Sequence, residues 1–339
     1  MTELKSLTSL RVGGAAKNFV SAGTEREIIA AIEAAGDQKI LIVGGGTNLL
    51  VSDAGFDGTV IHISNNQLKA EVDACSGATL SIGAGENWDE FVALTLQRGF
   101  AGLETLSGIP GTVGAAPIQN IGAYGHEVSE FITRVRTYDR QVRELKTFTN
   151  SECAFEYRSS IFKKNPGRFV ILEVQFQLRM GEMTDEITYA ELAKELGVDV
   201  GAKVLTERAR TAVLALRSRK GMLLDSSDHD SWSAGSFFTN PIVSAEVAAT
   251  LPKDAPRWPM SDGRVKTSAA WLIEHSGIHK GDVHGGAKVS SKHVLALTNS
   301  GDTTATEIIE LAIRIKDAVF LTFGIKIEPE VNIVGFSFK

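Results

Sequence analysis

The 339-residue sequence is poor in cysteine and contains no long hydrophobic run. Its two cysteines, Cys75 and Cys153, are too few for a disulfide framework and do not form a metal-binding motif. No apolar stretch approaches the roughly 20 residues that span a bilayer. Residues 1–11 also lack the basic and then apolar pattern of a signal peptide. We therefore expect a protein of the reducing cytoplasm with no membrane association.

Positive charge is also not in excess. The chain has 35 Lys and Arg residues against 41 Asp and Glu residues, which gives a net charge of −6. Because non-specific binding of nucleic acid requires a basic surface, we expect no nucleic-acid partner. A phosphorylated ligand is still allowed, since backbone N–H groups can bind phosphates without basic side chains.

Histidines offer the only pattern that suggests a metal. His275, His279 and His284 lie close together in the sequence, but Gly277 and Gly281 break the helix that would align them. Cysteine and carboxylate partners at ligand spacing are missing. We predict no metal site.

The patterns of strands and helices alternate, which predicts a mixed α/β protein of two or three domains. Thr24 with Glu27 and Thr304 with Glu307 have the spacing of capping boxes. Helices are expected at 24–36, 87–99, after Thr188, and at 207–219, 245–251, 269–275 and 304–324. Strands are expected at 39–43, 59–63, 79–83, 134–138, 169–178, 293–298 and 325–333.

Two glycine-rich segments follow strands or helices. The first contains Gly44, Gly45 and Gly46 and continues through Thr47, Asn48 and Leu49. It matches neither a Rossmann turn nor a Walker loop. Three glycines allow backbone N–H groups to approach a diphosphate, but they equally suit a tight turn. Both interpretations stay open.

The second segment, residues 108–125, is long, apolar and nearly free of charge. An exposed loop is not normally so apolar. Small residues would let it lie against a large flat ligand, while Thr112, Gln119 and Asn120 supply hydrogen bonds. The alternative is a buried structural loop, and the length and lack of charge favour the ligand.

Together the two segments resemble the flavin-contacting loops of the FAD-binding superfamily typified by vanillyl-alcohol oxidase. The sequences of residues 108–114 and 119–125 resemble in particular those of the UDP-N-acetylenolpyruvoylglucosamine reductase family. That family reduces an enolpyruvyl ether to UDP-N-acetylmuramate in peptidoglycan synthesis, using FAD and NADPH. The resemblance implies an α+β fold with two FAD-binding subdomains, at 1–65 with 325–339 and at 66–221, and a third α/β substrate domain at 222–324. It implies FAD contacts from Gly44, Gly45, Gly46, Thr47, Asn48, Leu49, Gly111, Thr112, Gly114, Ala115, Ile118, Gln119, Asn120, Gly122 and Tyr124.

Three further motifs are individually weak. Arg158, in 156–160, could bind a carboxylate through two hydrogen bonds or be a surface residue. Ser236, in 234–241, could pass a proton beside Phe237 and Phe238 or form a turn. Glu330, in 327–331, could be catalytic or lie on an exposed strand face.

In order and approximate spacing these motifs match the reductase family. The resemblance implies that Arg158 contacts the substrate carboxylate, that Glu330 assists it and that Ser236 donates a proton. Hydride comes from reduced FAD.

The resemblance also implies that Tyr189, Lys220 and Asn240 contact the UDP-sugar, with Lys220 holding the nucleotide diphosphate and Tyr189 marking the larger subtype of the family. Tyr189 could instead be an aromatic at a helix start, and Lys220 a favourable charge at a helix C-terminus.

The connector 221–232 departs from the family pattern. Lys292 and His293 stand where some members have glutamines, so we assign no substrate role to His293. Neither flavin loop contains the His or Cys that covalent attachment requires, so we predict dissociable FAD. We expect a monomer. A flavin-dependent alcohol oxidase and a non-catalytic flavin-binding module are the alternatives.

Overall fold

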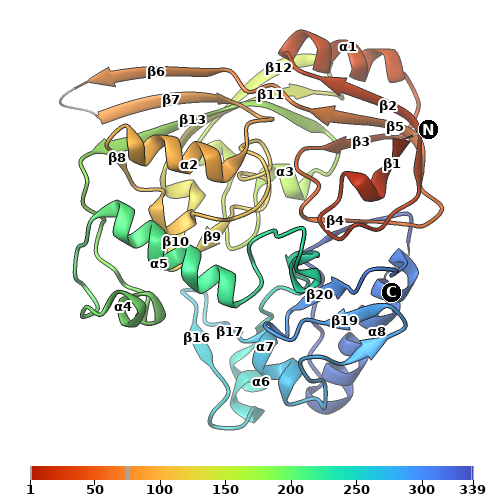
Figure 1. Cartoon of the computed structure of the whole chain (residues 1–339), viewed down its shortest axis with the longest axis vertical. Helices are drawn as coiled ribbons and strands as arrows, with labels where there is room; N and C mark the ends of the chain where they lie inside the picture. The colour runs from red at the N-terminus through yellow and green to blue at the C-terminus, as the bar shows by residue number, and fades with distance from the viewer. Residues whose placement is uncertain (1, 74–76, 337, 339) are drawn as a thin grey trace. The chain divides into compact units, whose positions relative to one another are not determined.

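The computed structural model describes residues 2–73, 77–336 and 338, so Cys75 lies outside the described residues. The chain forms two compact units (Figure 1). Unit 1 contains Lys17–Gly45 and Asp57–Leu223, and unit 2 contains Thr2–Ala16, Gly46–Phe56 and Leu224–Lys339. The domain borders expected from the sequence stay a prediction.

The first part of unit 1 is a helix beside parallel strands. α1 (Glu25–Ala35) begins at Thr24, whose side chain accepts the Glu27 N–H at 3.2 Å. The Glu27 carboxylate accepts the Gly23 N–H at 2.9 Å, so the predicted capping box is half formed. β3 (Ile40–Val43) pairs in parallel with β5 (Phe56–Ile63), and β2 (Ala15–Ala22) is the other neighbour of β5.

A larger antiparallel sheet forms the rest of the unit 1 core. Its strands are β6 (Leu68–Asp73), β7 (Gly77–Gly83), β8 (Phe100–Ala101), β11 (Ile132–Asp139), β12 (Glu144–Thr149) and β13 (Phe169–Met180), and the order along the main path is β12-β11-β13-β7-β6. The helix α2 (Trp88–Gln97) packs on this sheet. The ring centroid of Phe91 in α2 lies 5.1 Å from the ring centroid of Phe176 in β13. Asn87 caps α2, where the predicted helix 87–99 begins.

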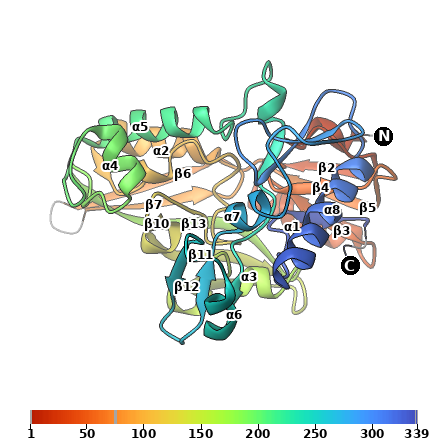
Figure 2. The same ribbon diagram turned by 90° about the horizontal axis from the view of Figure 1, so that it is seen from below.

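Two helices of unit 1 form a separate small core. α4 (Ala190–Leu196) and α5 (Thr206–Arg219) lie side by side in both views (Figures 1 and 2). Leu192 and Leu196 of α4 pack with Val213 and Leu216 of α5. α3 (Ile161–Lys164) is a single turn begun by Ser160.

Unit 2 combines two small sheets with α8. The first sheet has the order β14-β20-β19-β18, and the second the order β15-β17-β16. Their bounds are β14 (Ser233–Ser236), β18 (Val283–His284), β19 (Ala287–Val289), β20 (Ala296–Asn299), β15 (Ile242–Val243), β16 (Arg257–Pro259) and β17 (Val265–Thr267). The helices are α6 (Ala245–Thr250), α7 (Ala269–Glu274) and α8 (Ala305–Phe323). The predicted capping box of Thr304 and Glu307 is confirmed at the start of α8.

Two strand predictions in unit 2 are wrong in extent. The strand expected at 293–298 begins only at Ala296, because residues 293–295 turn and the Ala296 N–H bonds to the His293 carbonyl at 3.0 Å. The strand expected at 325–333 is reduced to β21 (Asn332–Val334), which pairs in parallel with β4 (Leu49–Val51). Glu330 is therefore outside a strand, and Pro329, which has no N–H, makes only an isolated bridge with Phe238.

Candidate active site

The first glycine loop needs its glycines for close packing. A Cβ on Gly44 would collide with the Thr112 side chain of the second loop. Gly46 has a φ of +61°, and a Cβ there would collide with the Leu7 carbonyl. Gly45 between them is exposed. The loop is thus a tight turn with one exposed glycine, and its contact with a diphosphate stays a prediction.

Asn48 connects this loop to the segment of Glu330 inside unit 2. Its side-chain amide donates to the Glu330 carbonyl at 3.2 Å. Its carbonyl accepts the Asn332 N–H at 3.1 Å, next to where β21 pairs with β4. Asn48, which belongs to the loop predicted to bind the cofactor, therefore holds the backbone of Glu330 in place.

The second loop is held against the start of α2. The Trp88 N–H bonds to the Gly111 carbonyl at 3.1 Å, and the Gly114 N–H bonds to the Ala84 carbonyl at 2.8 Å. A Cβ on Gly114 would lie 2.5 Å from the Ala84 Cβ. At its beginning, the Gly108 N–H donates to Asp89 Oδ1 at 2.6 Å. Position 114 therefore requires glycine, because there is no space for a larger side chain.

This loop is only partly buried. Val113, Gly114, Ala116 and Pro117 face inward, whereas Ala115 is exposed and Ile118 is 37% exposed. A purely structural loop would bury its apolar side chains. The exposed small and apolar positions fit a large flat ligand such as a flavin.

Arg158 is attached to the far end of the same loop. Its Nη1 donates to the Asn120 carbonyl at 3.2 Å, and its Nη2 donates to the Gly122 carbonyl at 2.8 Å. Asn120 and Arg158 both have positive φ, 46° and 52°. Such a conformation costs roughly 1–2 kcal/mol in a residue with a Cβ and is concentrated at functional sites. The structure thus joins a predicted catalytic residue to the predicted flavin loop.

The Asn120 side chain secures this junction. It is buried, its amide donates to Glu127 Oε2 at 2.6 Å, and its Oδ1 accepts the Ser129 N–H at 3.1 Å. Ser160 adds a bond from its hydroxyl to the Ile118 carbonyl at 2.5 Å. Asn120 and Ser160 therefore add three hydrogen bonds to those that Arg158 makes at this junction.

Tyr124, Tyr189 and Lys220 form a second group in unit 1. The rings of Tyr124 and Tyr189 meet edge to face with centroids 5.6 Å apart. Burial raises the pKa of Tyr124 to about 12, so its hydroxyl stays protonated. Lys220, the residue after α5, pairs with Glu191 of α4, with Nζ and Oε2 2.7 Å apart. A predicted FAD contact thus lies beside predicted substrate contacts.

Ser236 and Glu330 lie on adjoining segments of unit 2. Ser236 ends β14 and follows Gly235, which has a φ of +72°. The next residue, Phe237, donates its N–H to the Leu295 carbonyl and accepts the Glu330 N–H, both at 2.7 Å. The rings of Phe237 and Phe238 are buried. Ser236 is only half-buried and lies one residue from the bond that holds Glu330.

Asn240 has a structural contact that the sequence did not indicate. Its Oδ1 accepts the Ala269 N–H at 2.9 Å, at the first residue of α7. This bond stabilises a helix N-terminus. Its predicted contact with the UDP-sugar stays a prediction.

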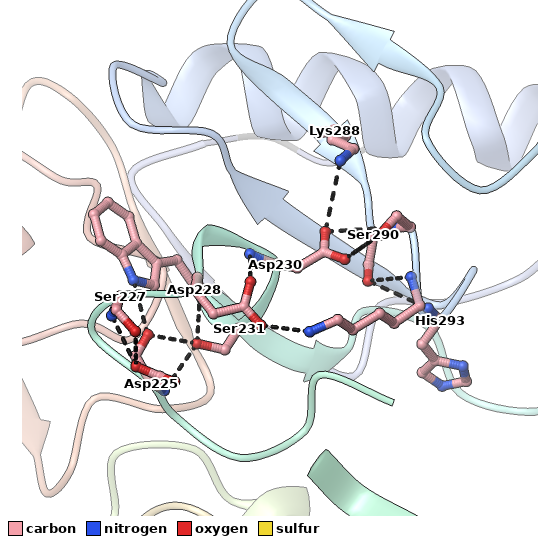
Figure 3. Close-up of polar contacts among 11 residues, drawn as sticks. Asp225, Ser227, Asp228, Asp230, Ser231, Lys288, Ser290 and His293 are labelled. Carbon is pink, nitrogen blue, oxygen red and sulfur yellow. Dashed lines mark hydrogen bonds and ion pairs between the residues drawn. The ribbon is translucent and has the colours of Figure 1, made fainter. Parts of the chain in front are cut away.

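The connector that departs from the family pattern is an ordered polar cluster (Figure 3). The Lys292 ammonium donates to the Asp228 carboxylate at 2.5 Å. The Asp230 carboxylate accepts hydrogen bonds from the backbone N–H and the hydroxyl of Ser291. The His293 N–H bonds to Ser290 Oγ at 3.2 Å. The connector is therefore tied to the turn that precedes β20, whose Leu295 carbonyl accepts the Phe237 N–H.

The histidines and helices give no indication of a metal site or a membrane span in the part of the chain that the structure describes. Within the described residues, no three His, Cys, Asp or Glu side chains gather as a metal site would require. His284 instead bonds to Glu310 at 2.9 Å, and His275 to the Trp271 carbonyl at 2.8 Å. Across 2–73, 77–336 and 338, none of the helices is both long and apolar enough to cross a bilayer.

Sequence reasoning missed two charged residues that organise this site. Asp89 pairs with Arg210 through two bonds of 2.6 and 2.8 Å while holding Gly108. Glu191 pairs with Lys220. Each partner is far away in the sequence, so no local pattern could have identified either pair.

Two family models match parts of this chain. Residues 16–145 match the model of an FAD binding domain, and residues 227–334 match the C-terminal domain of UDP-N-acetylenolpyruvoylglucosamine reductase. The chain is 48% identical over 337 residues to the UDP-N-acetylenolpyruvoylglucosamine reductase of Cutibacterium acnes, covering 98% of this chain and 89% of that protein. It is 45% identical over 345 residues to the enzyme of the same name from Streptomyces coelicolor, with the same coverage of 98% and 89%.

A solved structure shows the same fold. The UDP-N-acetylenolpyruvylglucosamine reductase of Thermus caldophilus aligns with a TM-score of 0.69 at 23% identity, covering 98% of this chain and 97% of that one. The predicted combination of an FAD-binding fold with a further domain is confirmed. By its identity to relatives along nearly its whole length, the chain belongs to the UDP-N-acetylenolpyruvoylglucosamine reductase family and is an oxidoreductase with an FAD-binding domain.

Proposed function

We propose that the protein reduces UDP-N-acetylglucosamine enolpyruvate to UDP-N-acetylmuramate for peptidoglycan synthesis, with NADPH as reductant and dissociable FAD. The observation that carries this proposal is the attachment of Arg158 to the second glycine loop. Its guanidinium donates to the carbonyls of Asn120 and Gly122, and so has a fixed position beside the residues that fit a flavin.

The two glycine loops would hold FAD through backbone groups and small side chains. Their polar side chains include Thr47 and Asn48 in the first loop and Thr112, Gln119 and Asn120 in the second. When bound, FAD supplies the hydride that reaches the alkene carbon of the substrate. Neither loop contains His or Cys, which supports non-covalent binding.

Arg158 would act on the substrate carboxylate. An enol ether is a poor hydride acceptor, and it becomes a better one when positive charge stabilises the negative charge that develops on the carboxylate. The two carbonyl bonds orient the guanidinium before the substrate arrives, so little reorganisation is needed. Glu330 would assist from unit 2, where its backbone N–H bonds to the Phe237 carbonyl.

Ser236 would donate the proton that completes the reduction. The hydroxyl belongs to a half-buried residue next to two buried phenylalanines. A positioned hydroxyl can quench a carbanion that forms next to the carboxylate. Tyr189, Lys220 and Asn240 would bind the UDP-sugar, with Lys220 holding its diphosphate and Tyr189 placing the protein in the larger subtype. We expect a monomer, which sedimentation of the purified protein tests.

Replacing Ser236 by Ala tests the proton-donor role. Anaerobic stopped-flow absorbance would follow flavin reduction by NADPH and then flavin reoxidation by the enolpyruvyl substrate. We expect reduction at nearly the wild-type rate and reoxidation slowed by at least about 100-fold, the range of general acid catalysis. Equal loss in both half-reactions would rule out this role.

A further inference from the structure

Lys220 has an acidic partner within its own unit. Its Nζ lies 2.7 Å from Oε2 of Glu191, and the two side chains are 36% and 39% exposed. Glu191 lies in the first turn of α4, two residues after Tyr189. Both of the unit 1 residues expected to bind the UDP-sugar are therefore next to this carboxylate.

Glu191 does not have the helix-capping role that its sequence position suggests. Thr188 and Glu191 have the spacing of a capping box. In the structure the N-cap is Tyr189, which makes no side-chain capping bond, and the Glu191 carboxylate reaches Lys220 instead. The carboxylate is thus used on an ammonium from another helix.

The surroundings place this pair beside the second glycine loop. The Tyr189 ring contacts Tyr124 at 5.6 Å, and a Cβ on Gly125 would lie 2.7 Å from Thr188 Oγ1. A diphosphate that bound Lys220 here would bring two negative charges near the Glu191 carboxylate. Like charges at such separations repel, and one ammonium cannot serve both anions equally well.

We propose that Glu191 is an internal competitor for the diphosphate of the UDP-sugar. In the ligand-free protein its carboxylate holds the Lys220 ammonium, and the incoming diphosphate displaces it. Glu191 thereby weakens binding of the sugar nucleotide and favours release of the product. This inference rests on the proposed role of Lys220 in binding the diphosphate.

The chain provides a matched control on the same two helices. Glu195 lies one turn after Glu191 on α4 and pairs with Arg219, the last residue of α5, through bonds of 3.2 and 2.5 Å. Replacing Glu195 by Gln removes an α4–α5 ion pair without touching Lys220. A change in ligand binding caused by altered helix packing would appear in both Glu191→Gln and Glu195→Gln. A change caused by the loss of the Lys220 partner would appear only in Glu191→Gln.

The experiment is a calorimetric titration of the FAD-loaded protein with UDP and, separately, with uridine. Uridine lacks the diphosphate, so it reports any change in the nucleoside site. We expect Glu191→Gln to tighten UDP binding about fivefold, the scale of one partly exposed ion pair, and to leave uridine unchanged. Glu195→Gln should bind both probes as the wild type does.

A double-mutant cycle then shows whether Glu191 acts through Lys220. We expect Lys220→Met to weaken UDP binding, and Glu191→Gln to have no effect when added to Lys220→Met. Unchanged or weaker UDP binding in Glu191→Gln, or equal tightening in Glu195→Gln, would overturn the inference while leaving the proposed function intact. Wild-type UDP affinity in Lys220→Met would instead overturn the role of Lys220, and the inference with it.

Discussion

The Asp89 carboxylate binds a backbone N–H in addition to its ion-pair partner Arg210. Its Oδ1 accepts the Gly108 N–H and Arg210 Nη1, both at 2.6 Å, and its Oδ2 accepts Arg210 Nη2 at 2.8 Å. Through Gly108 it fixes the beginning of the second glycine loop. Replacing Asp89 by Ala therefore removes a bidentate pair and a loop contact at once.

A second bidentate pair in unit 1 provides the comparison. Glu25 bonds to Arg136 at 2.9 and 3.0 Å, and its side chain is 33% exposed, close to the 32% of Asp89. Glu25→Ala should cost about 1 kcal/mol, as expected for a partly exposed pair. Asp89→Ala should cost about 3 kcal/mol, because the Gly108 N–H loses a charged acceptor and Arg210, only 19% exposed, loses its partner.

Urea unfolding measures these costs if it is followed by Trp88 fluorescence. The other three tryptophans all lie in unit 2 and can be replaced by Phe, so that the signal reports unit 1. We also expect Asp89→Ala to lose FAD affinity relative to Glu25→Ala, because only Asp89 accepts the Gly108 N–H at the start of the second glycine loop. Fluorescence of released flavin would measure that loss. Equal FAD affinity in Asp89→Ala and Glu25→Ala would refute the link from Asp89 to the loop.

The stability that Asp89 contributes should depend on pH, and the direction follows from the pKa of its carboxyl. Burial raises the pKa of Asp89, but the bonds from Arg210 and Gly108 outweigh it and hold the pKa below its ordinary value. A lowered folded-state pKa stabilises the protein fully above the unfolded pKa of about 4. The stability gap between wild type and Asp89→Ala should stay constant above that pH and shrink as the pH falls through the lowered pKa.

Two further predictions concern packing and burial. Gly114→Ala should abolish tight FAD binding, because the new Cβ would lie 2.5 Å from Ala84 Cβ, whereas Gly99→Ala should cost only about 1–2 kcal/mol of backbone strain, with no atom within 4 Å of its Cβ, and retain FAD. Flavin content after gel filtration distinguishes them, and equal retention would contradict the packing argument. Burial raises the pKa of the Cys153 thiol to about 12, so peptide mass spectrometry should find it unmodified by iodoacetamide at pH 8 until the protein is unfolded. Modification of the native protein would contradict this.

Local patterns predicted the local structure well. The caps of Asn87 and Thr304 and the glycine ends of α1 and α8 depend on residues within four positions, so the sequence shows them directly. The segment around Glu330 was predicted as a strand because polar and apolar residues alternate there. Pro329 cannot donate a backbone bond, and the strand begins only at Asn332.

Contacts between distant parts of the sequence were beyond such reasoning. Arg158 was a weak candidate because nothing near it indicates that its guanidinium meets carbonyls of the second loop, 36 and 38 residues earlier. The pair of Lys220 and Glu191 joins two helices in the same way. The family resemblance supplied the role of Arg158, but it gave no indication of Glu191.

The most direct test of the proposed function is an anaerobic titration of the purified protein that follows flavin absorbance. NADPH should bleach the bound flavin, and UDP-N-acetylglucosamine enolpyruvate should then restore the oxidised spectrum without oxygen. Recovery only after air is admitted would indicate an oxidase and contradict the proposed reaction. Purified protein that neither contains nor binds flavin would contradict the interpretation of both glycine loops.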